Sequence, residues 1–360
     1  MVSAMNTGNP APSLRTPSPA KSARLAGLHY AHSDGAGIQR RRAGKGFVFV
    51  TASGRRIRDE RVLRRIRSLV IPPAWENVWI CSSASGHLQA VGRDARGRKQ
   101  YRYHPNYRAF RERTKFTHML AFAQALPALR KRVRKDLNLP GLPRDKVLAA
   151  VVRLLDATSI RIGNDEYAKA NHSFGLTTLW NRHVQIDGPT LRFQFRGKSG
   201  QEHDIELKDH QLARIVKRCH DLPGHELFEY LDEEGKPAKV QSEDVNEYLR
   251  GITGEDFTAK DFRTWAGTTL SAMALEKLGD AASPAQAKKN VAEAIKFVSQ
   301  RLGNRPPACR KYYVHPLVID SYICGGLCQA MARRRGARAS SHRHAELAVI
   351  QLLKLHERAA

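Results

Sequence analysis

Two arginines, a lysine and a tyrosine in the second half of the chain have side chains suited to attack on a phosphodiester. Arg161 lies in SIRIGNDEY, Lys198 in FRGKSGQEH, Arg263 in KDFRTW and Tyr313 in LGNRPPACRKYY. Arginine binds phosphate oxygens bidentately, lysine can protonate a leaving oxygen, and tyrosine can act as a nucleophile. These residue types would together suffice to cleave a nucleic-acid strand without a metal ion.

Each of these residues also has an ordinary structural explanation. Arg161 stands where a helix is expected to end, which is typical of a surface cap. Lys198 lies in a glycine-bounded loop, which is typical of an exposed hairpin tip. Arg263 is two residues from Trp265, so a buried structural arginine is an alternative. For Tyr313, the cations of the RKYY segment favour the phenolate, but DNA binding without catalysis stays open.

The composition favours a nucleic-acid partner. The 360 residues include 61 Lys and Arg and 34 Asp and Glu, which gives a formal net charge of +27. An excess of this size is typical of proteins that bind a polyanion. No apolar run approaches the roughly 20 residues needed to span a bilayer. The five cysteines are irregularly spaced, which favours free thiols in a reducing cytosol over disulfides or a zinc site.

The first third of the chain predicts a basic tail followed by a small α+β domain. Residues 1–24 are rich in Pro, Ser and Ala and lack acidic residues, which indicates a disordered tail. Over 25–112, strands are expected in 46–54 and 78–92, with a helix in 59–72 between them. A run of cations, an amide and aromatics, GRKQYRYHP, presents Gln100, Tyr101 and Tyr103 as candidate DNA contacts.

The remainder, 113–360, predicts a mainly helical domain that includes the C-terminal helix. Apolar residues recur three and four positions apart in 117–133, 144–158, 209–222, 241–252, 287–303 and 345–357. One β region interrupts these helices, with strands expected in TTLW, HVQID, LRFQF and EHDIEL. The last two strands flank Lys198 and predict a hairpin with this lysine at its tip.

Taken in order, the motifs GRKQYRYHP, KVLAAVVRLLDATSIRIGNDEYA, FRGKSGQEHD, FTAKDFRTWAGT and LGN-x8-Y resemble those of the type IB DNA topoisomerases. The similarity is to the small bacterial and poxvirus-like form and extends over roughly residues 28–318. It implies the catalytic fold shared with tyrosine recombinases, preceded by a small β-rich domain. Together the two domains would form a C-shaped clamp around duplex DNA.

The resemblance implies a role for each candidate residue. Tyr313 would be the nucleophile that forms a 3′-phosphotyrosyl bond, Arg161 and Arg263 would hold the non-bridging phosphate oxygens, and Lys198 would protonate the leaving 5′-oxygen. Asn304 stands nine positions before Tyr313, where the family pattern has a histidine-type phosphate ligand. This spacing selects Tyr313 over Tyr312. An amide can donate a hydrogen bond but carries no charge.

The same resemblance implies the partners. Gln100, Tyr101, Tyr103 and Tyr167 match DNA-contacting positions, and the expected partner is double-stranded DNA bound by a monomer. Relaxation of positive and negative supercoils would need no metal, nucleotide or other cofactor and no membrane, in a cytoplasmic, nucleoid-associated enzyme. Two alternatives stay open from the residues alone, a tyrosine recombinase and a non-catalytic DNA-packaging protein.

Overall fold

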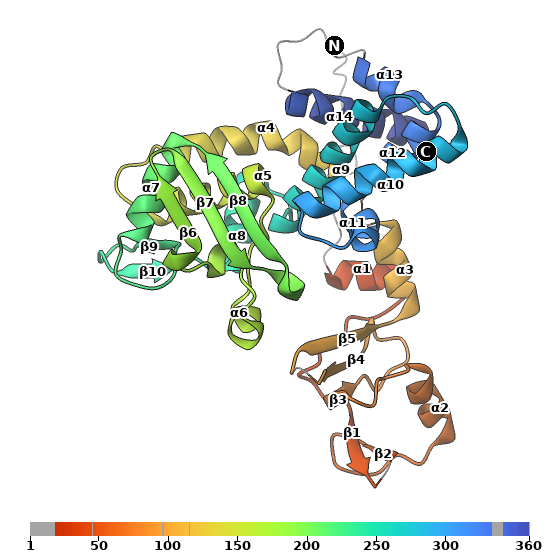
Figure 1. The fold of residues 1–360 in the computed structure, drawn as a ribbon. Helices are drawn as coiled ribbons and strands as arrows, with labels where there is room; N and C mark the ends of the chain where they lie inside the picture. Colours follow the sequence, from red (N-terminus) through yellow and green to blue (C-terminus); the bar gives the residue numbers. More distant parts are fainter. Residues whose placement is uncertain (1–18, 45, 96, 115, 333–340, 360) are drawn as a thin grey trace, which may run out of the picture. The chain divides into compact units, whose positions relative to one another are not determined.

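The computed structural model divides the chain into two compact units, Met1–His118 and Met119–Ala360 (Figure 1). It describes residues 19–44, 46–95, 97–114, 116–332 and 341–359. Helices and small antiparallel sheets make up the chain, so the predicted α+β composition is confirmed. Residues 1–18 of the expected tail lie outside the described part.

A five-stranded antiparallel sheet forms the body of the first unit, with strand order β2-β1-β3-β4-β5. Its strands are β1 (Ile38–Ala43), β2 (Gly46–Val50), β3 (Glu76–Ile80), β4 (Leu88–Arg93) and β5 (Lys99–Tyr103). Helix α2 (Glu60–Ser68) begins at the N-cap Asp59, whose carboxylate accepts the Arg61 backbone N–H. Ile66 of α2 packs against Ile38, Val78 and Ile80, which places the core between this helix and one face of the sheet.

Strands β1 and β5 are not among the strands expected from the sequence. Each carries a cationic run, IQRRRA in β1 and KQYRY in β5, which has little of the alternation that predicts a strand. In β1, Arg40 lies over the Phe47 ring at 4.1 Å and donates to the backbone carbonyl of Pro72 at 3.1 Å. Pairing and packing with distant residues therefore override the local pattern.

Residues 19–24, which the sequence analysis assigns to the tail, are helical. They belong to α1 (Pro19–Leu25), in which Ala23 is fully buried. Ala23 packs with Leu28 and with Tyr107 of α3 (Pro105–Arg113). Ala23 is buried by contact with a helix more than eighty residues away in sequence. The composition of residues 19–24 does not indicate such a contact, so the helix was not predicted.

The second unit is mainly helical, and the helices expected from periodicity are confirmed (Figure 1). Its helices are α4 (Met119–Asp136), α5 (Arg144–Thr158), α6 (Asp165–Asn171), α7 (His210–His220), α8 (Ser242–Thr253), α9 (Ala259–Leu278), α10 (Pro284–Arg301), α11 (Pro306–Tyr313), α12 (Pro316–Ile323), α13 (Gly326–Ala332) and α14 (Ser341–Ala359).

A three-stranded antiparallel sheet lies beside these helices, and a two-stranded one completes the unit. The first consists of β6 (Val184–Asp187), β7 (Thr190–Arg196) and β8 (Glu202–Lys208), and the second of β9 (Glu229–Leu231) and β10 (Pro237–Lys239). Strands β7 and β8 pair from Thr190↔Lys208 to Arg196↔Glu202, so the predicted hairpin is present. Leu191, Phe193 and Phe195 alternate with exposed residues along β7 and form its buried face.

The strand expected in TTLW is wrong. A 3₁₀ helix covers Leu176–Thr178 and a second one covers Asn181–His183. The Thr177 hydroxyl donates to the Ile162 carbonyl at 2.9 Å, and the Thr178 hydroxyl oxygen accepts the Gly175 N–H at 3.0 Å. These threonines thus bond to nearby backbone groups instead of extending a sheet.

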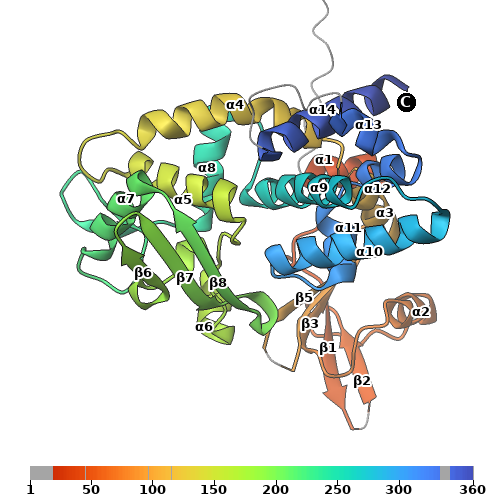
Figure 2. The ribbon, with the colours of Figure 1, turned by 45° about the horizontal axis from the view of Figure 1, so that its top comes forward.

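Helix α9 lies at the centre of the helical part, with α10, α11 and α14 packed around it (Figure 2). Its residues are small on the side of α11. A Cβ added at Gly267 would lie 2.4 Å from the backbone oxygen of Tyr313, so only glycine permits this approach. On the side of α14, Trp265 donates to the buried carboxylate of Glu346 at 3.0 Å, and Arg130 of α4 binds the same carboxylate at 2.7 Å. Helix α9 is therefore packed closely against α11 on one side and hydrogen-bonded to α14 on the other.

Candidate active site

Arg161 is directed by the end of α5. Ser159 adopts a left-handed conformation with φ of 57°, which ends the helix and turns the chain, while Ile160 is buried. The partly buried guanidinium of Arg161 then donates to the Gly303 carbonyl at 3.3 Å and to the side-chain oxygen of Asn304. Burial lowers the pKa of Arg161. The structure thus joins two sequence-predicted residues from segments more than a hundred positions apart.

Arg263 lies in the first turns of α9 and is only 3% exposed. Its guanidinium donates to the backbone carbonyl of Ser159 and, at 2.7 Å, to that of Leu302. Within the described ranges its Nε has no hydrogen-bond partner. Burial, and then repulsion by Arg161, lower its pKa to about 10. A buried cation with one uncommitted donor is suited to bind an anion.

Tyr313 is the last residue of α11, and its ring faces the two arginines. The Arg263 guanidinium carbon lies 5.1 Å from the ring centroid. Burial alone would raise the pKa of this phenol, but the charges of Arg263 and Arg161 outweigh burial and lower it. The main lowering charges thus come from residues far along the chain, and not from the neighbouring Arg310 and Lys311 that the sequence indicated.

Tyr312 has a different environment. It is 44% exposed, and the ammonium of the adjacent Lys311 lies 5.6 Å from its ring centroid. Tyr313 is only partly exposed and lies between α11 and α9. The two neighbouring phenols are therefore not equivalent, and Tyr313 is the one beside the arginines.

Asn304 follows the end of α10, where Gly303 turns the chain with φ of 57°. The Asn304 backbone N–H donates to the Ser299 carbonyl at 2.9 Å, as expected after a glycine-terminated helix. The side-chain oxygen accepts from Arg161. The amide nitrogen Nδ2 is buried and has no hydrogen-bond partner in the part of the chain that the structure describes. Asn304 therefore holds Arg161 and keeps one donor available.

Lys198 is exposed in the loop between β7 and β8, as predicted. The structure brings Arg161, Arg263, Asn304 and Tyr313 together but records no polar contact between Lys198 and these four. His203, which lies in FRGKSGQEHD and was not predicted as a site residue, contacts Gly197 beside Lys198 and Gly303 beside Asn304. Its only sequence signal was a place five positions after Lys198 in a hairpin, where β pairing brings residues back beside the loop.

The other predicted DNA contacts belong to the first unit and to α6 of the second. In the first unit, Tyr101 and Tyr103 stack with ring centroids 6.0 Å apart and are 45% and 40% exposed. Gln100 points to the opposite face of edge strand β5 and donates to Asp94 at 2.9 Å. Tyr167 belongs to α6, but its side chain lies outside the described part.

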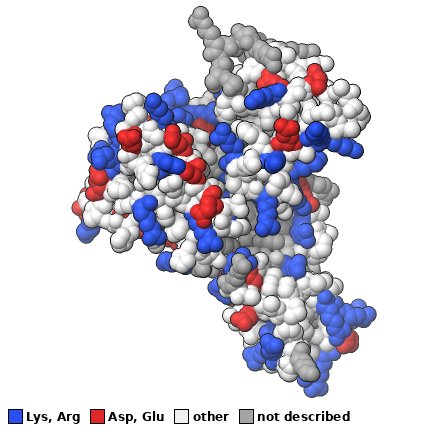
Figure 3. All heavy atoms as spheres, viewed as in Figure 1, with Lys and Arg blue, Asp and Glu red and all other residues white. Residues whose placement is uncertain are grey.

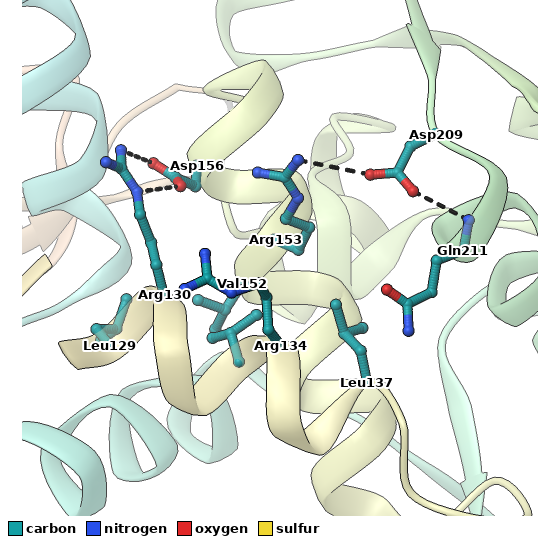
Figure 4. A pocket seen from close by; sticks show the side chains of 10 residues that line it. Leu129, Arg130, Arg134, Leu137, Val152, Arg153, Asp156, Asp209 and Gln211 are labelled. Atoms are coloured by element: carbon teal, nitrogen blue, oxygen red, sulfur yellow. Dashed lines mark hydrogen bonds and ion pairs between the residues drawn. The ribbon is translucent and has the colours of Figure 1, made fainter. Parts of the chain in front are cut away.

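A cavity of about 180 Å³ is lined by residues of α4, of α5 and of the start of α7 (Figure 4). Two of the arginines that line it are paired with carboxylates, Arg130 with Asp156 at 2.8 Å and Arg153 with Asp209 at 3.5 Å. None of the predicted catalytic residues lines it. This cavity is therefore not the candidate active site.

Charge and ligand types are consistent with an anionic partner. Lys and Arg side chains predominate over Asp and Glu on the face drawn in Figure 3. Among the described residues, no group of three or more His, Cys, Asp or Glu could hold a metal ion. The helices of the described ranges include none that is long and apolar enough to cross a membrane.

Comparison with known proteins places this geometry in a family. The model of the eukaryotic DNA topoisomerase I catalytic core matches residues 104–322, and that of the bacterial DNA topoisomerase IB N-terminal domain matches residues 46–94. DNA topoisomerase 1B of Acanthamoeba polyphaga mimivirus is 31% identical over 293 residues, which cover 79% of this chain and 87% of that protein. DNA topoisomerase 1B of Vaccinia virus (strain Copenhagen) is 22% identical over 254 residues, covering 68% and 75%.

These matches cover both units and define a DNA topoisomerase, an isomerase that acts on DNA topology. The chain belongs to the type IB DNA topoisomerase family and is an enzyme of that type. This assignment favours the topoisomerase prediction over the recombinase and DNA-packaging alternatives.

Proposed function

We propose that this enzyme relaxes positive and negative DNA supercoils by cutting one strand through a 3′-phosphotyrosyl intermediate, letting the free end rotate, and rejoining it. The observation that supports this is the position of Tyr313 beside Arg263 and Arg161, whose charges lower the pKa of its phenol. A phenol activated by two arginines that can also bind the reacting phosphate combines nucleophile and anion site.

In the cleavage step, the Tyr313 oxygen attacks the scissile phosphorus and its proton leaves to solvent. A bond from the phenol oxygen to phosphorus forms as the bond from phosphorus to the 5′-oxygen breaks. The Arg161 and Arg263 guanidiniums and the Asn304 amide nitrogen would bind the non-bridging oxygens, on which negative charge increases in the transition state. Removing one such donor typically costs about 10²–10³ in rate.

The expelled 5′-oxygen needs a proton, and we propose that Lys198 supplies it. An exposed lysine at a hairpin tip can reach a bound backbone phosphate, and a positioned general acid is worth about 10²–10⁴ in rate. Religation reverses both transfers. The 5′-hydroxyl returns its proton to Lys198 and attacks phosphorus, and Tyr313 leaves. Because the phosphotyrosyl bond conserves the energy of the phosphodiester, the proposed cycle uses no ATP.

The proposed substrate is duplex DNA, held in a C-shaped clamp by an N-terminal domain over residues 25–112 and a catalytic domain over 113–360. Tyr101 and Tyr103 present exposed rings on one face of the first unit and would contact the duplex there, with Gln100 at the edge strand. Tyr167 would add a contact from the catalytic domain. We further propose that the enzyme acts as a monomer in the nucleoid, without a nucleotide.

A plasmid assay tests this proposal. Purified enzyme is incubated with negatively or positively supercoiled plasmid in EDTA without ATP, and relaxation and covalent DNA adduct are measured together. We expect wild type to relax both forms. Tyr313→Phe should bind DNA but give neither relaxation nor adduct. Tyr312→Phe serves as the matched control and should retain both. Relaxation by Tyr313→Phe at the wild-type rate would refute the proposed mechanism.

A further inference from the structure

His203 lies at the base of the Lys198 hairpin and contacts the segment that carries Asn304. It is the second residue of β8 and pairs with Phe195 of β7, and the two rings stack with centroids 4.8 Å apart and planes 15° apart. A Cβ added at Gly197 would lie 2.7 Å from Cδ2 of the His203 ring. Cδ2 and Nε2 of the ring therefore lie against Gly197, the residue that precedes Lys198.

The ring also contacts the segment that follows α10. A Cβ added at Gly303 would lie 2.3 Å from Cε1 of His203, so the ring is also in close contact with the residue that precedes Asn304. Glycine is needed at both positions for the ring to fit. His203 is therefore placed between the chain neighbours of two proposed catalytic residues, Lys198 and Asn304.

We propose that His203 is a positioning residue that sets the place of the Lys198 hairpin relative to the phosphate-binding side chains Arg161 and Asn304. Lys198 has no polar contact of its own with that cluster, so the packing of His203 against Gly197 and Gly303 is the connection that the structure shows. This inference rests on the proposed function, because it takes Lys198 as the general acid.

The chemistry of the ring fits a packing role. Its nitrogens make no hydrogen bond with any residue that the structure describes, so the ring is held by stacking on Phe195 and by the two glycines. Burial, followed by repulsion from Arg161 and Arg263, lowers the pKa of His203 to about 4. The imidazole is therefore neutral at pH 7, and it adds no charge that would compete with the arginines for a phosphate.

The consequence is a specific defect in leaving-group protonation. Misplacing a catalytic group by about 1 Å can cost roughly 10²-fold in rate. Without the His203 ring, the hairpin loses its contact with the α10 end, and Lys198 loses its position. The hydrogen bonds of Arg161 and Arg263 and the ring contact of Tyr313 do not involve His203, so these three side chains should keep their positions. The attack on phosphorus should stay intact while protonation of the 5′-oxygen fails.

A change of leaving group separates these two effects. Single-turnover cleavage is measured on a duplex with one mapped cleavage site, carrying either the normal 5′-oxygen or a 5′-bridging sulfur. A thiol has a pKa of about 8.5, so the sulfur leaves as a thiolate without a general acid. We expect His203→Ala to slow cleavage about 10–100-fold with oxygen and less than about threefold with sulfur. Lys198→Ala should show the same pattern.

Three further variants complete the design. His203→Phe keeps a flat ring and should recover most of the rate with oxygen. His210→Ala removes an exposed histidine at the start of α7 and should change neither rate. Gly197→Ala clashes with the ring and should slow cleavage with oxygen, whereas adding it to His203→Ala should cost little more, because the ring is then absent.

The outcomes are distinguishable. Equal slowing of His203→Ala on both substrates, no slowing on either, or a His203→Phe variant no faster than His203→Ala would overturn the positioning role. The sulfur substrate also reports folding, since its cleavage needs an intact Tyr313 site. If Lys198→Ala itself is not rescued by sulfur, the general-acid assignment fails, and the proposal for His203 fails with it. Covalent cleavage by Tyr313 would still stand in that case.

Discussion

Replacing Asn304 with aspartate separates the two functions of its amide. The side-chain oxygen accepts a hydrogen bond from Arg161, while Nδ2 is buried with no partner among the described residues. Aspartate has the same shape and keeps an acceptor for Arg161. It loses the donor and places a negative charge where we propose that a phosphate oxygen binds.

The magnitude follows from that geometry. Loss of one donor to a phosphate oxygen in the transition state costs about 2.7–4 kcal/mol, or roughly 10²–10³ in rate. Repulsion between the new carboxylate and the phosphate adds to this loss. The fold should not suffer, because the carboxylate pairs with the partly buried Arg161, and a charged acceptor binds arginine more strongly than an amide does.

The assay is single-turnover cleavage of a suicide duplex from which the short 5′ product dissociates, so that the covalent complex accumulates. We expect Asn304→Asp to cleave at least about 10²-fold more slowly than wild type, with an unchanged melting temperature. Asn304→His, which restores a group that can carry charge, should change the rate in the opposite direction. Cleavage by Asn304→Asp within about threefold of wild type would refute the idea that Nδ2 binds the phosphate.

Two further predictions concern stability. Gly267→Ala places a Cβ 2.4 Å from the backbone oxygen of Tyr313, so it should destabilise the folded protein by about 1–3 kcal/mol and slow cleavage. Gly251→Ala in α8 has open space around it and should stabilise the folded protein by up to about 1 kcal/mol. Urea unfolding measures both, and similar shifts for the two variants would contradict the close approach of α11 to α9. His315 is the N-cap residue of α12. Burial holds the pKa of His203 and of His315 at about 4, below the usual value of about 6.5. The unfolded chain therefore binds these protons first, and stability should be complete above about pH 6.5 and fall toward pH 4. The decline should be smaller in His203→Phe, and an unchanged pH dependence would contradict a buried neutral ring.

Local patterns predicted the elements that carry the site. Apolar periodicity predicted α5 and α10, and Gly303 indicated where the chain turns after α10 toward Asn304. The turn toward Arg161 is made by Ser159, which no glycine indicated. The alternating strands around a glycine-bounded loop predicted the Lys198 hairpin. The residues that determine each of these helices and the hairpin are close together in sequence, so these elements can be predicted from a single sequence.

Long-range contacts could not be predicted in this way. The charges that act on Tyr313 come chiefly from Arg263 and Arg161, whereas its sequence neighbours suggested other cations. The role proposed for His203 depends on contacts of its ring both with Gly197 in the same hairpin and with Gly303, which is distant in sequence. The resemblance to a family predicted the site residues, but not the packing of His203 against Gly197 and Gly303.

The central claim is that Tyr313 is the residue that becomes linked to DNA, and peptide mapping of the trapped complex tests it most directly. Enzyme is reacted with a suicide duplex, digested with a protease and a nuclease, and the modified peptide is fragmented by mass spectrometry. We predict a nucleotide 3′-phosphate on Tyr313, beside Arg263, and none on the more exposed Tyr312. A phosphate on Tyr312, or a complex with no tyrosine linkage, would contradict the account.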